Sequence, residues 1–285
     1  MSAPRAIRAA TSELDFDRSP LLVIWETTRA CALACQHCRA EANMNRDPGE
    51  LGTEEGLRVI DEAASLAKIM VFSGGDALNR GDLEIFIRHA KRRGLHTGAI
   101  PAATKQLTRE RLESLRDAGL DQLALSLDAP KADLHDSFRG VPGAFERTIA
   151  AAAEVREAGL PLQINTCFGA WNLPYLEDMI ALIRDMGAVF WEVFLLVPMG
   201  RGRGLSGISA LQCEKLFERI YELNRERAAA ADGAFVAKIT EAPHYARFTL
   251  QRRLGEVQRF RVGVQGRRVS SEKSKVEFGR VLGRG

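Results

Sequence analysis

Short apolar segments alternate with longer amphipathic segments along the chain, from about residue 20 to residue 240. The apolar segments are rich in Leu, Ile, Val and Phe and have the length of buried strands, whereas the amphipathic segments repeat their apolar residues at helical spacing. Many of the helical segments end at a glycine, which can adopt the left-handed conformation that terminates a helix. The pattern predicts a series of strand–helix units.

These strand–helix units define the expected fold. Strands are predicted at residues 21–28, 68–75, 96–102, 121–128, 160–168, 189–198 and 235–242. Helices are predicted at residues 53–68, 82–93, 108–118, 144–158, 174–186 and 210–229. Because strand–helix–strand units place their strands parallel, the expected fold class is α/β, a partial (β/α)6 TIM-like barrel with parallel strands. The GxGxxG turn of a dinucleotide-binding sheet follows none of these strands, which argues against that class.

The distribution of charge divides the chain further. Residues 251–285 contain ten Lys and Arg but only three Asp and Glu, whereas the preceding part is slightly acidic. We therefore expect an N-terminal extension at 1–19, a barrel domain at 20–245 and a basic C-terminal tail at 246–285 that is poorly ordered. The acidic balance of the body argues against a nucleic acid as partner.

The overall composition is that of a globular protein. Hydrophobic residues make up 46% and charged residues 27% of the 285 residues, which is an ordinary balance. No apolar run reaches the ~18–20 residues that a membrane span needs. The N-terminus is charged and lacks the apolar core of a secretory signal. We expect a cytoplasmic protein with no membrane partner.

Three cysteines lie close together after the first predicted strand. Cys31, Cys35 and Cys38 have the spacing C-x3-C-x2-C, and thiolates are the soft ligands that bind zinc, copper(I) or iron–sulfur clusters. Structural zinc sites use four ligands in paired arrangements, but no second pair is present and His37 is poorly placed to be a fourth ligand. Three thiolates suit a [4Fe–4S] cluster with one iron open to a ligand. Zinc, or three buried cysteines without a metal, are the alternatives.

This cysteine motif resembles that of the radical S-adenosylmethionine (radical SAM) superfamily. The resemblance extends over about residues 20–245, and it is closest to the subgroup of peptide-maturing and haem-biosynthesis enzymes that carry a C-terminal auxiliary-cluster (SPASM-type) domain. It implies that Cys31, Cys35 and Cys38 bind a [4Fe–4S] cluster and that S-adenosylmethionine is the second cofactor. His37 takes a position that is usually aromatic and packs near the adenine.

The turn after the second predicted strand has the sequence Ser73-Gly74-Gly75-Asp76. Two glycines allow the backbone to approach a ligand closely, and carbonyl and carboxylate oxygens accept hydrogen bonds from an ammonium group. The resemblance implies that these four residues hold the methionine part of the cofactor. The superfamily usually has Gly-Gly-Glu-Pro here, whereas this chain has Asp76 followed by Ala77. A simple strand–helix turn is the alternative interpretation.

Further polar residues follow the later predicted strands. Ser126 and Asp128 end the fourth strand and resemble the superfamily's Ser-x-Asp, which contacts the ribose of the cofactor. Arg147 opens the next helix, where the resemblance implies a bidentate contact with the cofactor's carboxylate. Asn165 ends the fifth strand and could contact the cofactor. A turn cap for Asp128 and a solvated helix position for Arg147 remain the structural alternatives.

Several other residues are weaker candidates. The glycine-rich loop at 197–204 could bring its backbone to the adenine, and Glu241, His244 and Tyr245 are candidate groups for substrate binding or proton transfer. Cys167 lies on the same strand face as Asn165, but a free cysteine more often behaves as a small hydrophobic residue.

The leading functional hypothesis is a radical enzyme. The resemblance implies that S-adenosylmethionine is cleaved reductively to a 5′-deoxyadenosyl radical, which abstracts hydrogen from an unknown substrate. A peptide or a small molecule such as a tetrapyrrole is expected by analogy, and flavodoxin or ferredoxin is the expected reductant. No cysteine follows Cys213, so the auxiliary-cluster domain is expected to be absent. The alternative is a truncated or degenerate iron–sulfur and S-adenosylmethionine-binding protein without turnover.

Overall fold

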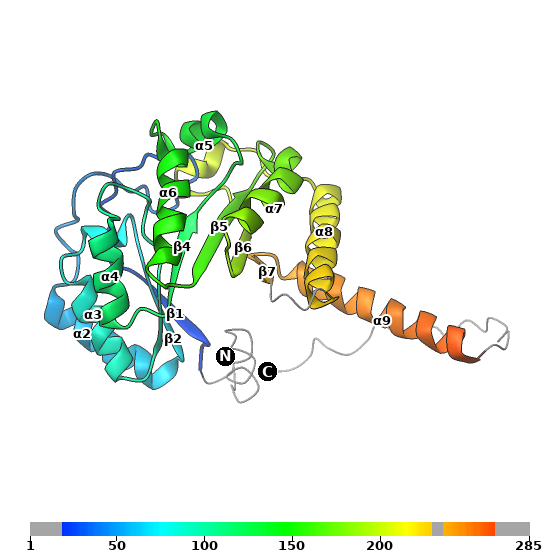
Figure 1. The fold of residues 1–285 in the computed structure, drawn as a ribbon, viewed down its shortest axis with the longest axis horizontal. Coiled ribbons are helices and arrows are strands. Elements are labelled where there is room, and N and C mark those ends of the chain that lie inside the picture. The colour runs from blue at the N-terminus through cyan, green and yellow to red at the C-terminus, as the bar shows by residue number, and fades with distance from the viewer. Residues whose placement is uncertain (1–18, 230–235, 266–285) are drawn as a thin grey trace. The chain divides into compact units, whose positions relative to one another are not determined.

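The computed structural model describes residues 19–229 and 236–265, and Figure 1 shows its arrangement. Seven parallel strands form one sheet in which each strand pairs only with its neighbours in sequence. The strands are β1 (Leu22–Glu26), β2 (Ile69–Ser73), β3 (His96–Ala99), β4 (Gln122–Ser126), β5 (Leu162–Phe168), β6 (Phe190–Leu195) and β7 (Val236–Thr240). The sheet curls into a half-barrel, so the predicted α/β fold with a partial parallel barrel is confirmed.

Helices connect the strands and lie on the outer face of the sheet (Figure 1). The predicted helices are α2 (Thr53–Leu66), α3 (Leu83–Arg92), α4 (Arg109–Ala118), α6 (Ala144–Glu157), α7 (Leu176–Asp185) and α8 (Ala210–Ala229). The structure adds α5 (Ala132–Arg139) and the short 3₁₀ helices η1 (Ala77–Asn79), η2 (Leu173–Tyr175) and η3 (Gly200–Gly204). The sequence analysis missed α5, a short helix in the connection between β4 and α6.

The core lies between the sheet and the outer helices. Trp25 on β1 and Phe86 on α3 have ring centroids 5.0 Å apart, and Phe72 and Phe86 are fully buried. A Cβ atom placed on Gly56 of α2 would lie 2.6 Å from both the Trp25 and the Phe86 rings. Glycine at this position therefore lets α2 pack directly onto the aromatic core.

The inner, concave face of the sheet is more open. Successive residues of a strand point to opposite faces, so Ile24 faces away from the side on which Trp25 packs, and it is 56% exposed. On β2, Ile69, Val71 and Ser73 are half-buried, whereas the residues between them are buried. The concave face is therefore available for a ligand along most of the sheet.

The contacts divide the chain into two units, with the boundary between Pro243 and His244. The second unit contains helix α9 (His244–Gln265), so residues 246–265 are helical where the sequence analysis expects a poorly ordered tail. Contacts between successive helical turns explain the difference: Arg247 Nη1 donates to Gln251 Oε1 at 2.7 Å, and the Arg252 guanidinium lies 5.3 Å from the Phe248 ring centroid. Such pairs at spacing i, i+4 stabilise a helix.

Residues 1–18, 230–235 and 266–285 lie outside the described residues. The expected extension at 1–19 and the end of the expected tail fall there. Within the described part of the chain, no helix is long and apolar enough to cross a membrane.

Candidate functional site

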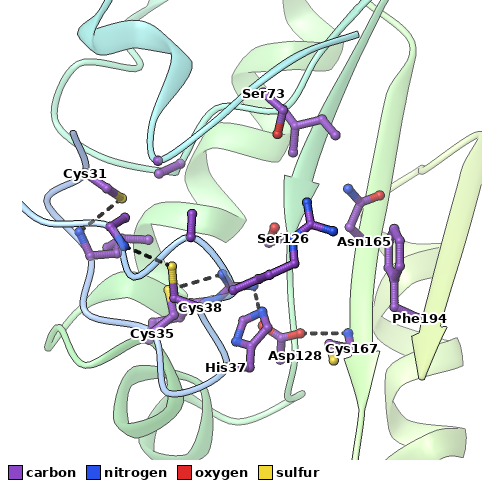
Figure 2. Close-up of a pocket in the computed structure, with 18 of the residues that line it drawn as sticks. Cys31, Cys35, His37, Cys38, Ser73, Ser126, Asp128, Asn165, Cys167 and Phe194 are labelled. Carbon is purple, nitrogen blue, oxygen red and sulfur yellow. Dashed lines mark hydrogen bonds and ion pairs between the residues drawn. The ribbon is translucent and has the colours of Figure 1, made fainter. Parts of the chain in front are cut away.

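The three motif cysteines line a cavity of about 360 Å³ at the carboxyl ends of the strands. Figure 2 shows the three cysteines in the loop after β1, facing residues from β4 and β5. Ten of the twelve residues predicted to bind metal or cofactor line this cavity: Cys31, Cys35, His37, Cys38, Ser73, Gly74, Gly75, Ser126, Asp128 and Asn165. The sequence therefore identified one coherent site, with Asp76 and Arg147 outside its lining.

The turn after β2 fixes the start of the cysteine loop. The Gly75 N–H donates to the Thr28 carbonyl at 2.6 Å, and the Asp76 N–H donates to the Ala30 carbonyl at 2.8 Å. A Cβ atom on Gly75 would lie 2.5 Å from the Ala30 oxygen, closer than packing allows. The sequence predicts that the glycine pair lets the backbone approach a ligand; in the structure, Gly75 also lets it pack closely against the start of the cysteine loop.

Helix α5 supports the middle of the cysteine loop. The Ala34 and Gln36 N–H groups donate to the carbonyls of Arg139 and Phe138 at 3.0 and 2.9 Å. These carbonyls belong to the last turn of α5, where helical carbonyls have no partner within the helix. Gly140 follows with a φ of +69°, and a Cβ atom on it would lie 2.8 Å from the Ala34 oxygen. The end of α5 therefore binds the cysteine loop through its free carbonyls, and Gly140 allows the two segments to pack closely.

The glycine-rich loop after β6 supports the other side. Arg201 in η3 donates from Nε to the Cys35 carbonyl at 2.9 Å and from Nη1 to the Ala42 carbonyl at 2.8 Å. Its backbone N–H donates to the Cys38 carbonyl at 3.1 Å. Residues 197–204, proposed from the sequence to meet the adenine, thus contact the cysteine loop, a role that the sequence analysis missed.

Each cysteine sulfur has its own hydrogen-bond donor. The Leu33 N–H donates to Cys31 Sγ at 3.4 Å, the Ala42 N–H to Cys38 Sγ at 3.4 Å, and Arg139 Nη1 to Cys35 Sγ at 3.5 Å. Donors of this kind stabilise thiolates and tune iron–sulfur clusters.

The donor set fits a cluster better than a single ion. Among the described residues, no group of three or more His, Cys, Asp or Glu could hold one metal ion. The ligands of one ion must converge on a point, whereas the thiolates of a [4Fe–4S] cluster each bind a different iron and therefore lie further apart. The three cysteines, all facing one cavity and each with a donor to its sulfur, fit the second arrangement.

His37 presents an aromatic face at this cavity. Its ring stacks on Phe138, with centroids 4.6 Å apart and planes 10° apart, and Phe138 stacks on Trp171 at 4.5 Å. Burial lowers the pKa of His37 to about 4, so the ring is neutral at physiological pH. Within the part of the chain that the structure describes, its buried Nδ1 atom has no hydrogen-bond partner, which is consistent with a site that a ligand completes.

Asp76 is bound to the protein rather than directed into the cavity. Its carboxylate is fully buried and accepts from the Leu78 N–H at 3.1 Å, the Ala102 N–H at 3.2 Å and Thr104 Oγ1 at 2.9 Å. Burial raises its pKa, and these donors oppose the rise. In this structure Asp76 caps η1 and holds the segment after β3 in place. Because Ala102 and Ala103 of that segment line the cavity, Asp76 supports the cavity wall without lining it.

Arg147 also lies beside the cavity rather than in its lining. Its Nε atom donates to the Ala103 carbonyl at 3.3 Å, and Ala103 itself lines the cavity. The predicted contact of Arg147 with a cofactor carboxylate stays a prediction, because the side chain is held by the backbone in this structure.

Asp128 forms a buried ion pair with Arg139. Its other carboxylate oxygen accepts from the Cys167 N–H at 2.8 Å, and its own N–H donates to His135 Nδ1 at 3.2 Å. Burial alone would raise the pKa of Asp128, but the adjacent Arg139 guanidinium holds it below its usual value. Asp128 is therefore a carboxylate already neutralised by a protein cation, and its predicted contact with the ribose stays a prediction.

Ser126 and Asn165 lie side by side in the register of β4 and β5. Gln163 Nε2 donates to Asn165 Oδ1 at 2.7 Å, which leaves the Asn165 amide N–H groups for a ligand. Gln163 in turn also donates to Glu192 on β6 at 3.0 Å. The two neighbouring strands thus present a hydroxyl and an oriented amide donor at the cavity (Figure 2).

The rim of the cavity contains charged residues, two of which the sequence analysis did not select. Glu26 and Arg39 form an ion pair at 2.6 Å, and both line the cavity together with Glu241. Glu241 has a φ of +62°, an unusual conformation for a residue with a side chain. The fourth cavity cysteine, Cys167, is half-buried, and partial burial raises the pKa of its thiol.

Comparison with known proteins agrees with this geometry. The sequence profile described as "Radical SAM superfamily" matches residues 25–185, from the last two residues of β1 through the cysteine loop and β2–β5 to the end of α7. The chain belongs to the radical SAM superfamily. Membership implies a [4Fe–4S] cluster and S-adenosylmethionine as cofactors, as the sequence analysis expected.

Individual relatives refine the relationship. The AdoMet-dependent heme synthase of Oleidesulfovibrio alaskensis is 40% identical over 241 residues, which cover 83% of this chain and 60% of the relative. The PqqA peptide cyclase of Ruegeria pomeroyi is 37% identical over 176 residues, which cover 61% of this chain and 47% of the relative. The chain thus spans about half to two-thirds of the length of these curated relatives.

A solved structure shows the same fold. Streptococcus suis SuiB bound to S-adenosylmethionine superimposes with a TM-score of 0.66 at 15% identity, covering 83% of this chain and 55% of SuiB. The partial barrel of this chain is therefore also the fold of SuiB.

Proposed function

We propose that this radical SAM protein is an enzyme that cleaves S-adenosylmethionine reductively and uses the resulting radical on a haem precursor. The observation that carries the proposal is the braced loop that directs Cys31, Cys35 and Cys38 into the same cavity as Ser126 and Asn165. When bound, the cluster and S-adenosylmethionine supply one-electron chemistry that begins with hydrogen abstraction from the substrate.

Different residues would bind the cluster and the parts of S-adenosylmethionine. Cys31, Cys35 and Cys38 would hold three irons of the cluster. Ser73, Gly74 and Gly75 border the cavity, and the Gly74 and Gly75 carbonyls would accept hydrogen bonds from the cofactor's ammonium group. The Ser73 carbonyl already accepts from the Thr27 N–H and Oγ1, both at 2.9 Å. His37 would offer its ring face to the adenine.

Polar groups from β4 and β5 would bind the sugar. The Ser126 hydroxyl can donate or accept, and the oriented Asn165 amide donates, a combination that suits the paired hydroxyls of a ribose. Arg147 would bind the cofactor's carboxylate after releasing the Ala103 carbonyl. Asp76 and Asp128 would act on the cavity wall as positioning residues, because protein donors already occupy their carboxylates.

The proposal of a haem precursor as substrate rests on the relatives. The heme synthases share 40% identity over most of the barrel, against 37% over a shorter segment for the peptide cyclases. A peptide is the second candidate, supported by those cyclases. Flavodoxin or ferredoxin would supply the electron. Binding of the cofactor without turnover is the alternative.

Anaerobic reconstitution with iron and sulfide tests the proposal. The reduced protein, given S-adenosylmethionine, should form 5′-deoxyadenosine, and a chain that binds the cofactor without forming this product would support the alternative. A variant with Cys31, Cys35 and Cys38 all changed to Ala should lose the cluster's iron, sulfide and electron paramagnetic resonance signal. A triple variant that retains a full cluster would overturn the assignment of the ligands.

A further inference from the structure

Arg139 places a buried positive charge against one of the three cysteines. It is the last residue of α5, and its side chain is 8% exposed. Nη1 donates to Cys35 Sγ at 3.5 Å, and Nη2 pairs with Asp128. The buried Nε atom has no hydrogen-bond partner among the described residues, and Arg139 lines the cavity. The guanidinium thus joins the cysteine loop to the end of β4 and keeps one donor for a ligand.

The Arg139 guanidinium and the Asp128 carboxylate form a buried pair of one positive and one negative charge. Asp128 is the one carboxylate paired with it among the described ion pairs, and Asp128 is itself 1% exposed. Water therefore screens neither charge well, and the effect of each on a neighbouring group is larger than at the surface. Exchanging either side chain for a neutral one of similar shape changes the local charge by one unit in a known direction.

We propose that Arg139 raises the reduction potential of the cluster through its hydrogen bond to Cys35, and that Asp128 limits this effect. The inference rests on the proposed function, because it requires that Cys35 binds the cluster. The reduced cluster carries one more negative charge than the oxidised cluster, so a cation beside a ligand sulfur stabilises the reduced form. Arg139 acts through Cys35, and it is therefore a positioning residue rather than a catalytic one.

The two members of the ion pair should have opposite effects. In Arg139→Gln the cation is lost while Asp128 keeps its negative charge, so the midpoint potential should become more negative. In Asp128→Asn the amide oxygen can still accept from the Cys167 N–H, but Arg139 loses its counter-charge, so the potential should become more positive. Arg139→Lys keeps the positive charge and should lie between wild type and Arg139→Gln. A merely structural role would not produce shifts of opposite sign.

The test is a redox titration of each reconstituted protein without S-adenosylmethionine, followed by electron paramagnetic resonance of the reduced cluster. Iron and sulfide analysis of every variant confirms that each holds a cluster. The matched control is Arg109→Gln, which removes a surface arginine that pairs with Glu113 and Glu157 on the outer side of the protein and should leave the potential unchanged.

Opposite shifts for Arg139→Gln and Asp128→Asn would support the inference. Equal shifts, shifts of the same sign, or a shift in the control as large as in Arg139→Gln would overturn it. If Arg139→Gln cannot hold a cluster, Asp128→Asn and Arg139→Lys still decide, because a more negative potential in Asp128→Asn contradicts the inference. Failure of the wild-type protein to hold any cluster would instead contradict the proposed function.

Discussion

The two faces of the curved sheet are built from alternate residues of the same strands, yet the outer face packs into the core and the concave face lines the cavity. On β6, Trp191 and Val193 face the outer helices and are fully buried, whereas Glu192 between them faces the concave side. On β2, the buried Phe72 is followed at once by Ser73, which borders the cavity. A change of one residue along a strand therefore separates a position of the core from a position of the site.

This division has a physical reason. The outer face excludes water and gains stability from apolar area, so its side chains must be apolar and closely packed. On the concave face, polar side chains can be satisfied by one another or by a ligand, as the hydrogen bond from Gln163 to Glu192 shows. Substitutions on the two faces should therefore affect stability and binding separately.

The largest expected effect is on the outer face. Trp191→Ala removes a fully buried ring that packs edge-on against Phe168 and donates to Thr166 Oγ1 at 2.9 Å. The free energy of unfolding should fall by ~3–5 kcal/mol, because a large cavity is left and a buried hydroxyl loses its donor. Urea denaturation of the protein measures this loss. A change below 1 kcal/mol would mean that the outer face does not carry the stability assigned to it.

The second largest effect is expected at Gly75, in the turn between β2 and η1. Gly75→Ala places a Cβ atom 2.5 Å from the Ala30 oxygen and 2.7 Å from the Arg29 oxygen. The backbone must move, at a cost of about 3 kcal/mol, and the cysteine loop should hold less iron after reconstitution. The matched control is Gly81→Ala, since a Cβ atom there meets nothing within 4 Å. Equal iron contents in the two variants would contradict the role of the turn.

A lower pH should destabilise the protein through His135, a histidine that lines the cavity. Burial lowers the pKa of His135 to about 4, below its unfolded value of about 6.5. The unfolded chain therefore binds the proton first as the pH falls, and stability is lost between about pH 6.5 and pH 4. We expect this residue to contribute about 2 kcal/mol of the loss between pH 7 and pH 5.

Urea denaturation at pH 7 and pH 5 measures that effect. The comparison is with His135→Asn, which cannot titrate in this range but can still accept from the Asp128 N–H. The variant should lose less stability than wild type over the same interval. The same pH dependence in both proteins would show that His135 is not the group responsible.

The smallest expected effect is on the concave face. Ser126→Ala removes a hydroxyl from the cavity while the backbone pairing of β4 with β5 remains. The loss of one hydrogen bond should weaken S-adenosylmethionine binding about tenfold, with a melting temperature near that of wild type. Calorimetry of the reconstituted protein measures the affinity. A loss of stability without a loss of affinity would place Ser126 in the core instead.

Much of the fold and the location of the site could be predicted from the sequence. The repeated apolar segments identified all seven strands, because a parallel sheet needs continuous apolar runs of strand length. The spacing of the cysteines identified their chemistry, since few other roles bring three thiols together within eight residues. The polar residues at strand ends met in one cavity because parallel strands end at one edge of the sheet.

The finer roles could not be predicted in the same way. The sequence predicts ligand contacts for Asp76 and Asp128, but local sequence does not reveal which carboxylates are bound by distant donors such as Thr104 and Arg139. For the same reason, local sequence does not reveal that Arg139, which the sequence analysis does not select, is buried beside Cys35. Helix α9 was missed because the contacts that support it are pairs between its own turns, within a segment whose composition is basic and poor in apolar residues.

The groups that bind the cysteine loop come from widely separated parts of the chain. During synthesis, the loop is therefore made well before the residues that hold it in place. The loop is complete once residue 43 has been made, but the carbonyls at the end of α5 follow about a hundred residues later, and Arg201 comes after the sixth strand. A nascent chain that folds from its N-terminus would expose three thiols long before their surroundings exist. Metal insertion should therefore wait for η3, and chains interrupted before residue 201 should accumulate oxidised or mispaired cysteines rather than cluster.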